Sequence, residues 1–203
     1  MNDLFTTQLE SHGFTPHEIS QIVKLGKLKT LPAKSILIKQ NNVANEFYFL
    51  IDGFCHSCYL TEQGKQFSKE FYWKGDWVVG FEELLDQTPS PYTLETITQT
   101  TLIALPITLL NQWRKDANLL YIKLLETQLL YKERKERFML LNSPQSRYEV
   151  FCQNYPNLRA QLSDYQVAAY LGITHISLSR IKNRIKNRIK NRIKNRIKKV
   201  NIS

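Results

Sequence analysis

The hydrophobic and polar positions of the chain change period twice. A helix is predicted to start at Thr15-Pro16, with Glu18 placed to complete a capping box, and to end near Gly26. From residue 31 to residue 105 short apolar or alternating runs are separated by turn residues. These runs are 35–38, 46–51, 54–60, 67–73, 92–97 and 102–105. Many short strands at close spacing predict an antiparallel sandwich or barrel of the jelly-roll type.

The helical period returns between residues 107 and 141, which we expect to form one long helix. Its apolar residues at steps of three and four are Leu110, Trp113, Ala117, Leu120, Leu124 and Tyr131, and Leu119, Ile122, Leu125 and Leu129 widen the apolar surface. Such a helix carries more apolar surface than a small β-domain covers, which predicts a dimer seam. The seam residues are expected to be Trp113, Ala117, Leu120, Leu124 and Tyr131. A helix packed only on its own domain is the alternative.

Pro144 interrupts the helical pattern, and a further helix is predicted from Ser143 through Phe151, ending at Tyr155-Pro156. Residues 163–181 then predict two short helices joined by a sharp turn. The first helix has a capping box, Ser163 with Gln166, and its left-handed end is assigned to Gly172. The second helix has Thr174 as its N-cap. Ile173 is expected to fill the angle between the helices, and five small or apolar residues are expected on their facing sides: Val167, Ala168, Leu171, Leu178 and Ile181.

This pattern is typical of a helix-turn-helix, whose second helix enters the major groove of DNA. An ordinary helical hairpin in a core is the alternative. The second helix should expose His175, Ile176, Ser179 and Arg180, four side chains that core packing does not require. This exposed set favours DNA binding.

The net charge of +10 belongs to one segment. Eleven of the 28 Lys and Arg residues, and no acidic residue, lie in residues 180–199, which leaves 17 basic against 18 acidic residues elsewhere. Such asymmetry indicates a polyanionic partner that meets the C-terminal segment.

An Arg-Ile-Lys-Asn repeat fills this basic segment. Because a four-residue unit drifts by about 40° per repeat on a helix, its isoleucines form no continuous stripe. Like charges four residues apart also disfavour an isolated helix. Two interpretations stay open: an expanded gene repeat that a free end tolerates, or a basic extension of the second helix that lies against phosphates.

Cysteine and histidine usage argues against secretion, metal binding and catalysis. Three cysteines favour a reducing cytoplasm, and no signal peptide or membrane-length apolar run is seen. Cys55 and Cys58 form a C-x-x-C, but residues three apart on a regular strand face opposite sides, so both thiols could reach one ion only if a bulge intervened, and Cys152 would join them only if the fold brought it near. The four histidines are scattered without a catalytic motif. We therefore expect no metal, no cofactor and no enzymatic activity.

The order of strands, long helix and helix-turn-helix resembles the Crp–Fnr family of bacterial transcription regulators over residues 15–185. Leu50-Ile51-Asp52-Gly53, Glu62-Gln63-Gly64-Lys65 and Gly75-Asp76 match its turn glycines. Arg137-Phe138-Met139-Leu140-Leu141, Ser146-Arg147-Tyr148 and residues 169–181 resemble a branch common in Bacteroidetes.

The resemblance implies an α+β fold with an N-terminal antiparallel β-roll of cyclic-nucleotide-binding type. The expected parts are residues 1–108, the effector-binding-like domain; 109–142, the dimerisation helix; and 143–203, the helix-turn-helix domain with its basic tail. A C-terminal wing is expected to be absent, because few residues follow the tail.

A cytoplasmic, homodimeric regulator that binds double-stranded DNA and RNA polymerase is the function that the resemblance implies. The positions matching base contacts are His175, Ile176 and Arg180, and those suited to phosphates are Thr174, Ser177, Lys182, Arg184 and Lys186. The alternative is an effector-sensing interaction protein with weak nonspecific DNA binding.

The segment that matches the family's phosphate cassette departs from it. The candidate effector residues are Gly80, Phe81, Glu82, Ser90, Tyr92 and Thr93. No Arg or Lys lies between Lys74 and Arg114, so a cyclic phosphate would be buried without a paired cation. We therefore expect an unidentified neutral or cationic effector, or a pocket filled by the protein's own side chains, rather than cyclic AMP.

Overall fold

The computed structural model describes residues 3–200, with the side chains of Arg192 and of residues 195–200 outside the description. The chain divides into two compact units, Met1–Arg137 and Phe138–Ser203. Our finer division at residues 108 and 142 stays a prediction.

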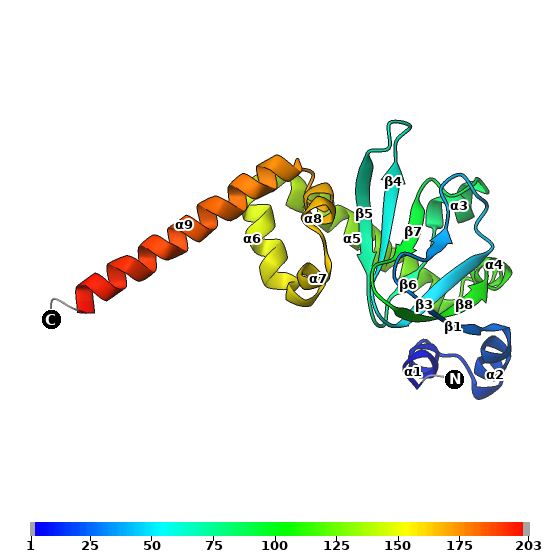
Figure 1. Ribbon diagram of the computed structural model, residues 1–203. Helices are drawn as coiled ribbons and strands as arrows, with labels where there is room; N and C mark the ends of the chain where they lie inside the picture. The colour runs from blue at the N-terminus through cyan, green and yellow to red at the C-terminus, as the bar shows by residue number, and fades with distance from the viewer. Residues whose placement is uncertain (1–2, 201–203) are drawn as a thin grey trace. The chain divides into compact units, whose positions relative to one another are not determined.

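The first unit contains two four-stranded antiparallel sheets, with strand orders β1-β8-β3-β6 and β2-β7-β4-β5 (Figure 1). The strands are β1 Lys27–Leu31, β2 Ile36–Ile38, β3 Glu46–Asp52, β4 Cys55–Leu60, β5 Gln66–Tyr72, β6 Trp77–Val78, β7 Thr93–Thr96 and β8 Thr100–Pro106. The predicted α+β fold with an antiparallel β-roll is confirmed. Strands β1 and β6 were not predicted: β1 has no apolar run, and the apolar run at 77–79 that contains β6 is shorter than the runs that predict the other strands.

Strand β3 is buried on both faces, which explains its continuous run of apolar residues. Tyr48 and Leu50 belong to the core cluster between the two sheets. Phe47 and Phe49 belong to a second cluster, where helices cover the other face of the sheet. These helices include α1 Asp3–Ser11, α2 Pro16–Leu25, α4 Ile107–Lys115 and α5 Leu119–Leu141, while the short α3 Phe81–Asp86 precedes β7. The capping box predicted for α2 is present, with Thr15 as N-cap.

The predicted single helix over 107–141 is wrong, since α4 and α5 are separate. Ala117 lies between them with a left-handed φ of 47°, outside either helix. The Asn118 side chain accepts a hydrogen bond from Leu120 N at 2.9 Å and caps the start of α5. A helical apolar period runs through this break, and for that reason the pattern alone did not reveal it.

The break also changes which side chains a partner can reach. Trp113 and Leu120 are buried in the unit's own core, and Leu124 packs partly buried against the same cluster, so these expected seam residues already have partners. Tyr131 is half-buried, and Ala117 lies in the turn. The exposed apolar residues of α5 include Leu119, Ile122, Leu125, Leu129 and Leu130. The expectation for Trp113, Ala117 and Leu120 is therefore corrected: they do not form an exposed helical seam.

The second unit is helical, with α6 Pro144–Asn154, α7 Pro156–Gln161, α8 Asp164–Tyr170 and α9 His175–Val200. Helix α6 lies where a helix was predicted, with Ser143 as N-cap. Helix α7 was not predicted, because Pro156 was read as a terminator although proline is also favoured at the first helical position. The core contains Phe151, Leu158, Leu162, Val167, Leu171, Leu178 and Ile181. The chain is helical from His175 to Val200, and the expectation about a wing concerns residues beyond this point, outside the described residues.

Within residues 3–200, none of the helices combines the length and the apolar character needed to cross a membrane.

Candidate nucleic-acid interface

The turn between α8 and α9 is built by the caps that the sequence predicts. Ser163 Oγ accepts from Gln166 N at 3.3 Å, and Gln166 Oε1 accepts from Ser163 N at 3.0 Å, which completes the capping box of α8. Ser177 N donates to Thr174 Oγ1 at 3.1 Å and fixes the start of α9. Gly172 has a φ of +64°, a conformation that L-residues rarely adopt, and a Cβ there would lie 2.8 Å from Met139 Cε.

Arg147 of α6 forms a hydrogen bond with the backbone of this turn. Its Nη1 donates to the carbonyl oxygen of Leu171 at 2.6 Å and lies 3.5 Å from Met139 Sδ. The charged donor satisfies a carbonyl at the end of α8, where helices leave such groups unpaired. The sequence places Arg147 in the Ser146-Arg147-Tyr148 motif but does not predict this contact, because Leu171 lies 24 residues away.

Helix α9 separates a buried face from an exposed one. Leu178 and Ile181 are buried, whereas Ile176, Ser179 and Arg180 are exposed, as predicted. Asn183 is also exposed and lies one turn after Ser179 and Arg180, on the same face. Sequence reasoning missed Asn183, although its spacing of three and four from exposed residues was a usable signal.

His175 is half-buried, which differs from the predicted full exposure. Its ring stacks on Tyr165 of α8, with ring centroids 4.2 Å apart and an interplanar angle of 9°. Tyr165 itself is 71% exposed. The stack leaves the edges of the imidazole, rather than its face, as the polar groups that His175 can present.

Ion pairs tie both flanks of α9 to neighbouring helices. Asp164 of α8 lies 2.5 Å from Lys182 Nζ and 2.6 Å from Arg159 Nη2. The hydrogen bond from Lys182 lowers the pKa of Asp164 below its ordinary value. Lys182, a predicted phosphate contact, therefore already has an anionic partner.

On the opposite flank α9 is tied to α6. Arg184 Nη1 donates to Gln145 Oε1 at 3.3 Å, and Arg188 Nη2 lies 2.5 Å from Glu149 Oε1. Both contacts are at the surface, so an incoming phosphate can compete for these guanidinium groups. Lys186 is exposed.

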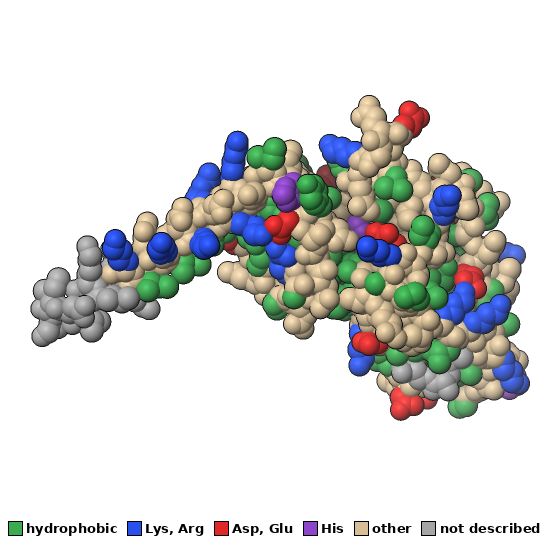
Figure 2. Space-filling view, in the orientation of Figure 1, with side chains coloured by type: hydrophobic (Ala, Val, Ile, Leu, Met, Phe, Trp, Pro, Cys, Tyr) green, Lys and Arg blue, Asp and Glu red, His purple; other side chains and the backbone are tan. Residues whose placement is uncertain are grey.

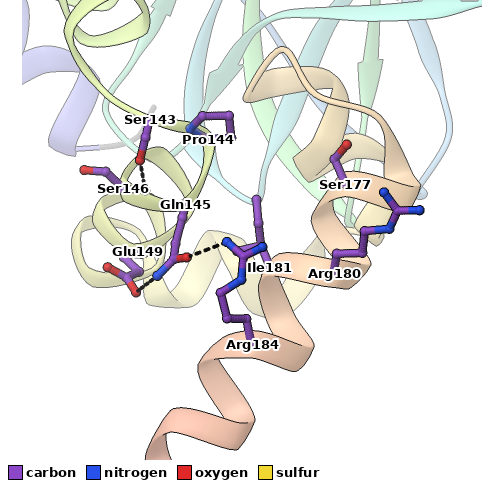
Figure 3. A pocket seen from close by; sticks show the side chains of 9 residues that line it. All are labelled: Ser143, Pro144, Gln145, Ser146, Glu149, Ser177, Arg180, Ile181 and Arg184. Atoms are coloured by element: carbon purple, nitrogen blue, oxygen red, sulfur yellow. Dashed lines mark hydrogen bonds between the residues drawn. The ribbon is translucent and has the colours of Figure 1, made fainter.

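A groove of about 450 Å³ lies between the N-terminus of α6 and the first turns of α9 (Figure 3). Its walls carry Ser143, Ser146 and Ser177 together with Arg180 and Arg184. Figure 3 shows Arg184 turned toward Gln145, whereas Arg180 points away from α6. The groove thus combines hydroxyl groups, two arginines and the positive end of a helix dipole, which attract a phosphate, with the carboxylate of Glu149, which is paired with Arg188.

The basic repeat continues α9 as one helix to Val200, projecting beyond α6 (Figure 1). Lys and Arg side chains follow the part of it that Figure 2 colours. Its isoleucines turn away from the core as the four-residue period requires: Ile181 is buried, Ile185 half-buried, and Ile189 and Ile193 are 52% and 54% exposed. Like charges four residues apart disfavour a helix in the repeat. The repeat is helical nevertheless, because it extends a helix whose first turns are already capped and packed, so that no new nucleation is needed.

In the first unit, the buried acid of the cassette segment is Glu83, whereas the expected Glu82 is exposed. Ser90 Oγ donates to Glu83 Oε1 at 3.2 Å, and a Cβ on Gly80 would lie 1.8 Å from the same oxygen. Tyr92 is fully buried, and its hydroxyl has no hydrogen-bond partner among the described residues. Phe81 is half-buried, and Thr93 Oγ1 accepts from Gln40 N at 3.2 Å.

The expectation that this region lacks a cation needs correction, because the tertiary structure supplies one. The pairing of Ser57 with Glu70 and of Cys58 with Ser68 leaves Lys69 as the extra residue of a bulge in β5. Lys69 Nζ lies 3.8 Å from the centroid of the Tyr92 ring. Burial lowers the pKa of Lys69 and raises that of its neighbour Glu70. Sequence reasoning missed Lys69 since it lies outside the cassette segment.

A cavity of about 350 Å³ lies in the same unit, between β5, α1 and α5. Trp73, Trp77 and Phe81 line it, together with the carboxyl groups of Glu70 and Asp76. Burial raises the pKa of Asp76 to about 6. Trp77 Nε1 is buried without a hydrogen-bond partner among the described residues.

Comparison with known proteins bears on both units. The family model of the cyclic nucleotide-binding domain matches residues 28–116. The fold is similar to that of a putative Crp/Fnr-family transcriptional regulator from Eubacterium rectale, with a TM-score of 0.73 and 13% identity, covering 89% of this chain and 87% of that one. No curated protein matches the sequence.

Two further solved structures have the same fold. The c-di-GMP-responsive global regulator CLP of Xanthomonas campestris has a TM-score of 0.69 and 15% identity, covering 85% of this chain and 92% of CLP. FixK2 of Bradyrhizobium japonicum has a TM-score of 0.66 and 16% identity, covering 80% of this chain and 85% of FixK2. At these identities the similarity establishes the fold.

Proposed function

We propose that this protein is a DNA-binding transcription regulator that acts as a homodimer in the cytoplasm and responds to an effector other than cyclic AMP. The observation that carries the proposal is the capped start of α9, which presents Ile176, Ser179 and Arg180 to solvent on a rigid support. A helix held in this way has the form needed to enter a major groove. The similarity in fold to Crp/Fnr-type regulators supports the same reading.

The exposed face of α9 supplies the side chains that would read bases. Arg180 can pair bidentately with guanine, and Asn183 with adenine. Ile176 suits a thymine methyl group, and an edge of His175 can donate or accept one hydrogen bond. These four residues lie within 175–183, about two turns of helix, which is the length that a recognition helix places in one groove.

Phosphates would be bound on both sides of that face. Thr174, Ser177 and Lys186 lie at the surface of α9 or at its start, and the groove beside α6 adds Arg184 and the helix N-terminus. Lys182 would contact a phosphate only after its ion pair with Asp164 breaks. Such contacts position the protein without reading sequence.

The proposed dimer seam is the exposed apolar side of α5. Ile122, Leu125 and Leu129 are spaced by three and four residues, as in a coiled-coil seam, and each is exposed. A two-fold dimer would place its recognition helices on half-sites about 34 Å apart. RNA polymerase is the expected partner of such a regulator on DNA.

We propose the aromatic cavity beside β5 for the effector, and of the six residues expected from the sequence it contains Phe81. Its aromatic walls suit a small molecule, and the two carboxyl groups of Glu70 and Asp76 favour a neutral or cationic one, although Lys123 and His12 also line the cavity. We infer a binding function, without enzymatic activity, for the whole chain.

Selection of bound sequences from random DNA tests the proposal. The native protein should enrich a site with two-fold symmetry. Retention of DNA without any enriched sequence would instead support the alternative, an interaction protein with weak nonspecific DNA binding.

Arg180→Ala is expected to weaken binding to the selected site by about 1–3 kcal/mol, or roughly 5- to 150-fold, since one bidentate contact per half-site is lost. The same selection should show a relaxed preference at one base pair in each half-site. Arg114→Ala removes an exposed arginine of α4 and serves as the matched control. An unchanged sequence preference in Arg180→Ala would contradict the assignment of Arg180 as a base reader.

Cyclic AMP and cyclic GMP are expected not to bind at micromolar concentrations. Glu83 is buried in the cassette segment, and Lys69, the nearby cation, is already placed over the Tyr92 ring. A cyclic phosphate would have to displace Lys69 or lie beside a buried carboxylate. Isothermal titration calorimetry checks this, and a micromolar Kd for either nucleotide would contradict it.

A further inference from the structure

Three metal-ligating side chains meet on adjacent strands of the β2-β7-β4-β5 sheet. His56 and Cys58 lie on β4, and Glu95 lies on β7 directly opposite His56. One ligand atom from each of the three side chains lies within 4.8 Å of the others. Cys55, by contrast, packs in the core between the sheets, so the C-x-x-C pair does face two ways, as the sequence analysis expected.

His56 is placed as a metal ligand would be. The side chain is fully buried, and its Nε2 lies 2.6 Å from Ser68 Oγ, while its ring stacks on Phe71. Its other nitrogen, Nδ1, is buried and has no partner at hydrogen-bond distance among the described residues, but it lies 3.6 Å from Glu95 Oε1, and the interaction with His56 lowers the pKa of Glu95. A buried nitrogen in this position is costly unless something binds it. Metal-bound histidines typically donate their second N–H to a neighbouring oxygen, the role that Ser68 can take here.

We propose that His56 Nδ1, Cys58 Sγ and a Glu95 carboxylate oxygen bind one divalent metal ion, with Zn²⁺ as the ion that fits best. Nitrogen, thiolate and carboxylate ligands together are typical of zinc and unlike the all-oxygen sites of magnesium and calcium. Zinc bond lengths place neighbouring ligand atoms about 3.3–3.8 Å apart around a tetrahedron. The 3.6 Å between His56 and Glu95 matches this spacing.

Cys58 completes the site by a small movement. The 4.8 Å limit on its separation from the other ligand atoms leaves about 1 Å to close, which a side-chain rotation achieves. Gln66 Nε2 lies 2.8 Å from Cys58 Sγ and can stabilise the thiolate that forms when the thiol loses its proton to solvent. The Glu95 side chain is 27% exposed, so an ion has a route in and a water can take the fourth position.

This site goes beyond the proposed function and does not depend on it. It joins β4 to β7, two neighbours in one sheet, and involves none of the residues assigned to DNA or to the dimer seam. The sequence pattern did not reveal it, because 37 residues separate Cys58 from Glu95 and the visible signal was the unrelated Cys55–Cys58 pair.

Cobalt substitution in the full-length protein tests the proposal. Protein freed of metal by a chelator is titrated with Co²⁺ and then with Zn²⁺. We expect one Co²⁺ per chain, with the visible absorption of tetrahedral cobalt and a near-ultraviolet thiolate-to-cobalt band, both lost when Zn²⁺ displaces it. Absence of a tetrahedral spectrum in the native protein would overturn the proposal.

Variants assign the ligands. Cys58→Ser should remove the thiolate-to-cobalt band, whereas Cys152→Ser, the matched control, should keep it. Because Cys58 is buried, circular dichroism must show native folding, and Glu95→Gln, at a partly exposed position, provides a second variant that should weaken Co²⁺ binding at least tenfold. A band that survives in folded Cys58→Ser, or Glu95→Gln binding at native affinity, would contradict this ligand set.

Discussion

Leu129→Glu is expected to convert the proposed dimer into monomers. Leu129 is 60% exposed in the isolated chain and lies one turn after Leu125 in the proposed seam of Ile122, Leu125 and Leu129. In a two-fold dimer each copy would bury one unpaired carboxylate, at a cost of about 3–5 kcal/mol. The dimer dissociation constant should then rise at least about 100-fold, since each 1.4 kcal/mol is a factor of ten.

Light scattering of the protein as it elutes from a size-exclusion column measures the change in mass. The substituted residue must lie outside the unit's own core. Leu124→Glu would damage the unit's own core, because Leu124 packs against it. Leu129→Glu should keep a native circular dichroism spectrum. Leu60→Glu, at a 43% exposed leucine of β4, is the matched control and should remain dimeric. A native protein that is monomeric at micromolar concentration, or a Leu129→Glu protein that stays dimeric, would rule out this seam.

Truncation after Asn187 is expected to weaken binding to all DNA sequences and to reduce its salt dependence. It removes Arg188, Lys190, Arg192, Lys194, Arg196, Lys198 and Lys199, seven cations per chain. Each cation that engages a phosphate adds about 0.9 to the slope of log K against log salt. The preferred site should stay the same, because the residues proposed to read bases all precede the cut.

We expect the truncation to reduce the slope of log K against log salt by less than seven cations per chain would give. The four-residue repeat rotates its cations around α9 by about 40° per unit, so one helix face cannot hold all of them against phosphates. A shorter truncation after Asn195, which removes three of the seven cations, should give a smaller loss. An unchanged slope after the longer truncation would mean that the tail does not touch DNA, and an expanded gene repeat would then suffice to explain it.

The local features of the second unit were predictable from the sequence. The capping box of Ser163 with Gln166, the left-handed Gly172 and the Thr174 cap each depend on residues within four positions, and all three are present. The alternation of exposed and buried positions on α9 follows from the helical period alone. Six of the eight strands of the β-roll were predictable for a similar reason, since a short apolar run between turn residues is typical of a strand.

The sequence could not predict which apolar residues of 107–141 are buried in the first unit's own core and which stay exposed. The apolar residues of 107–141 all fit a helical stripe, yet the fold gives Trp113 and Leu120 to the unit's own core and leaves Leu129 outside. Which apolar residue is covered depends on the shape of the sheet beneath it and on the break at Ala117. Periodicity contains neither piece of information.

Long-range pairing decided the remaining chemistry. The bulge in β5 turns Lys69 toward Tyr92, and the register of β4 with β7 sets His56 opposite Glu95. A shift of either register by one residue would send these side chains to the other face of the sheet. The sequence by itself therefore determined the caps and most of the helices and strands, whose causes are local. Tertiary structure decided the charged and metal-ligating clusters, because strand pairing brings together residues that are far apart in the chain.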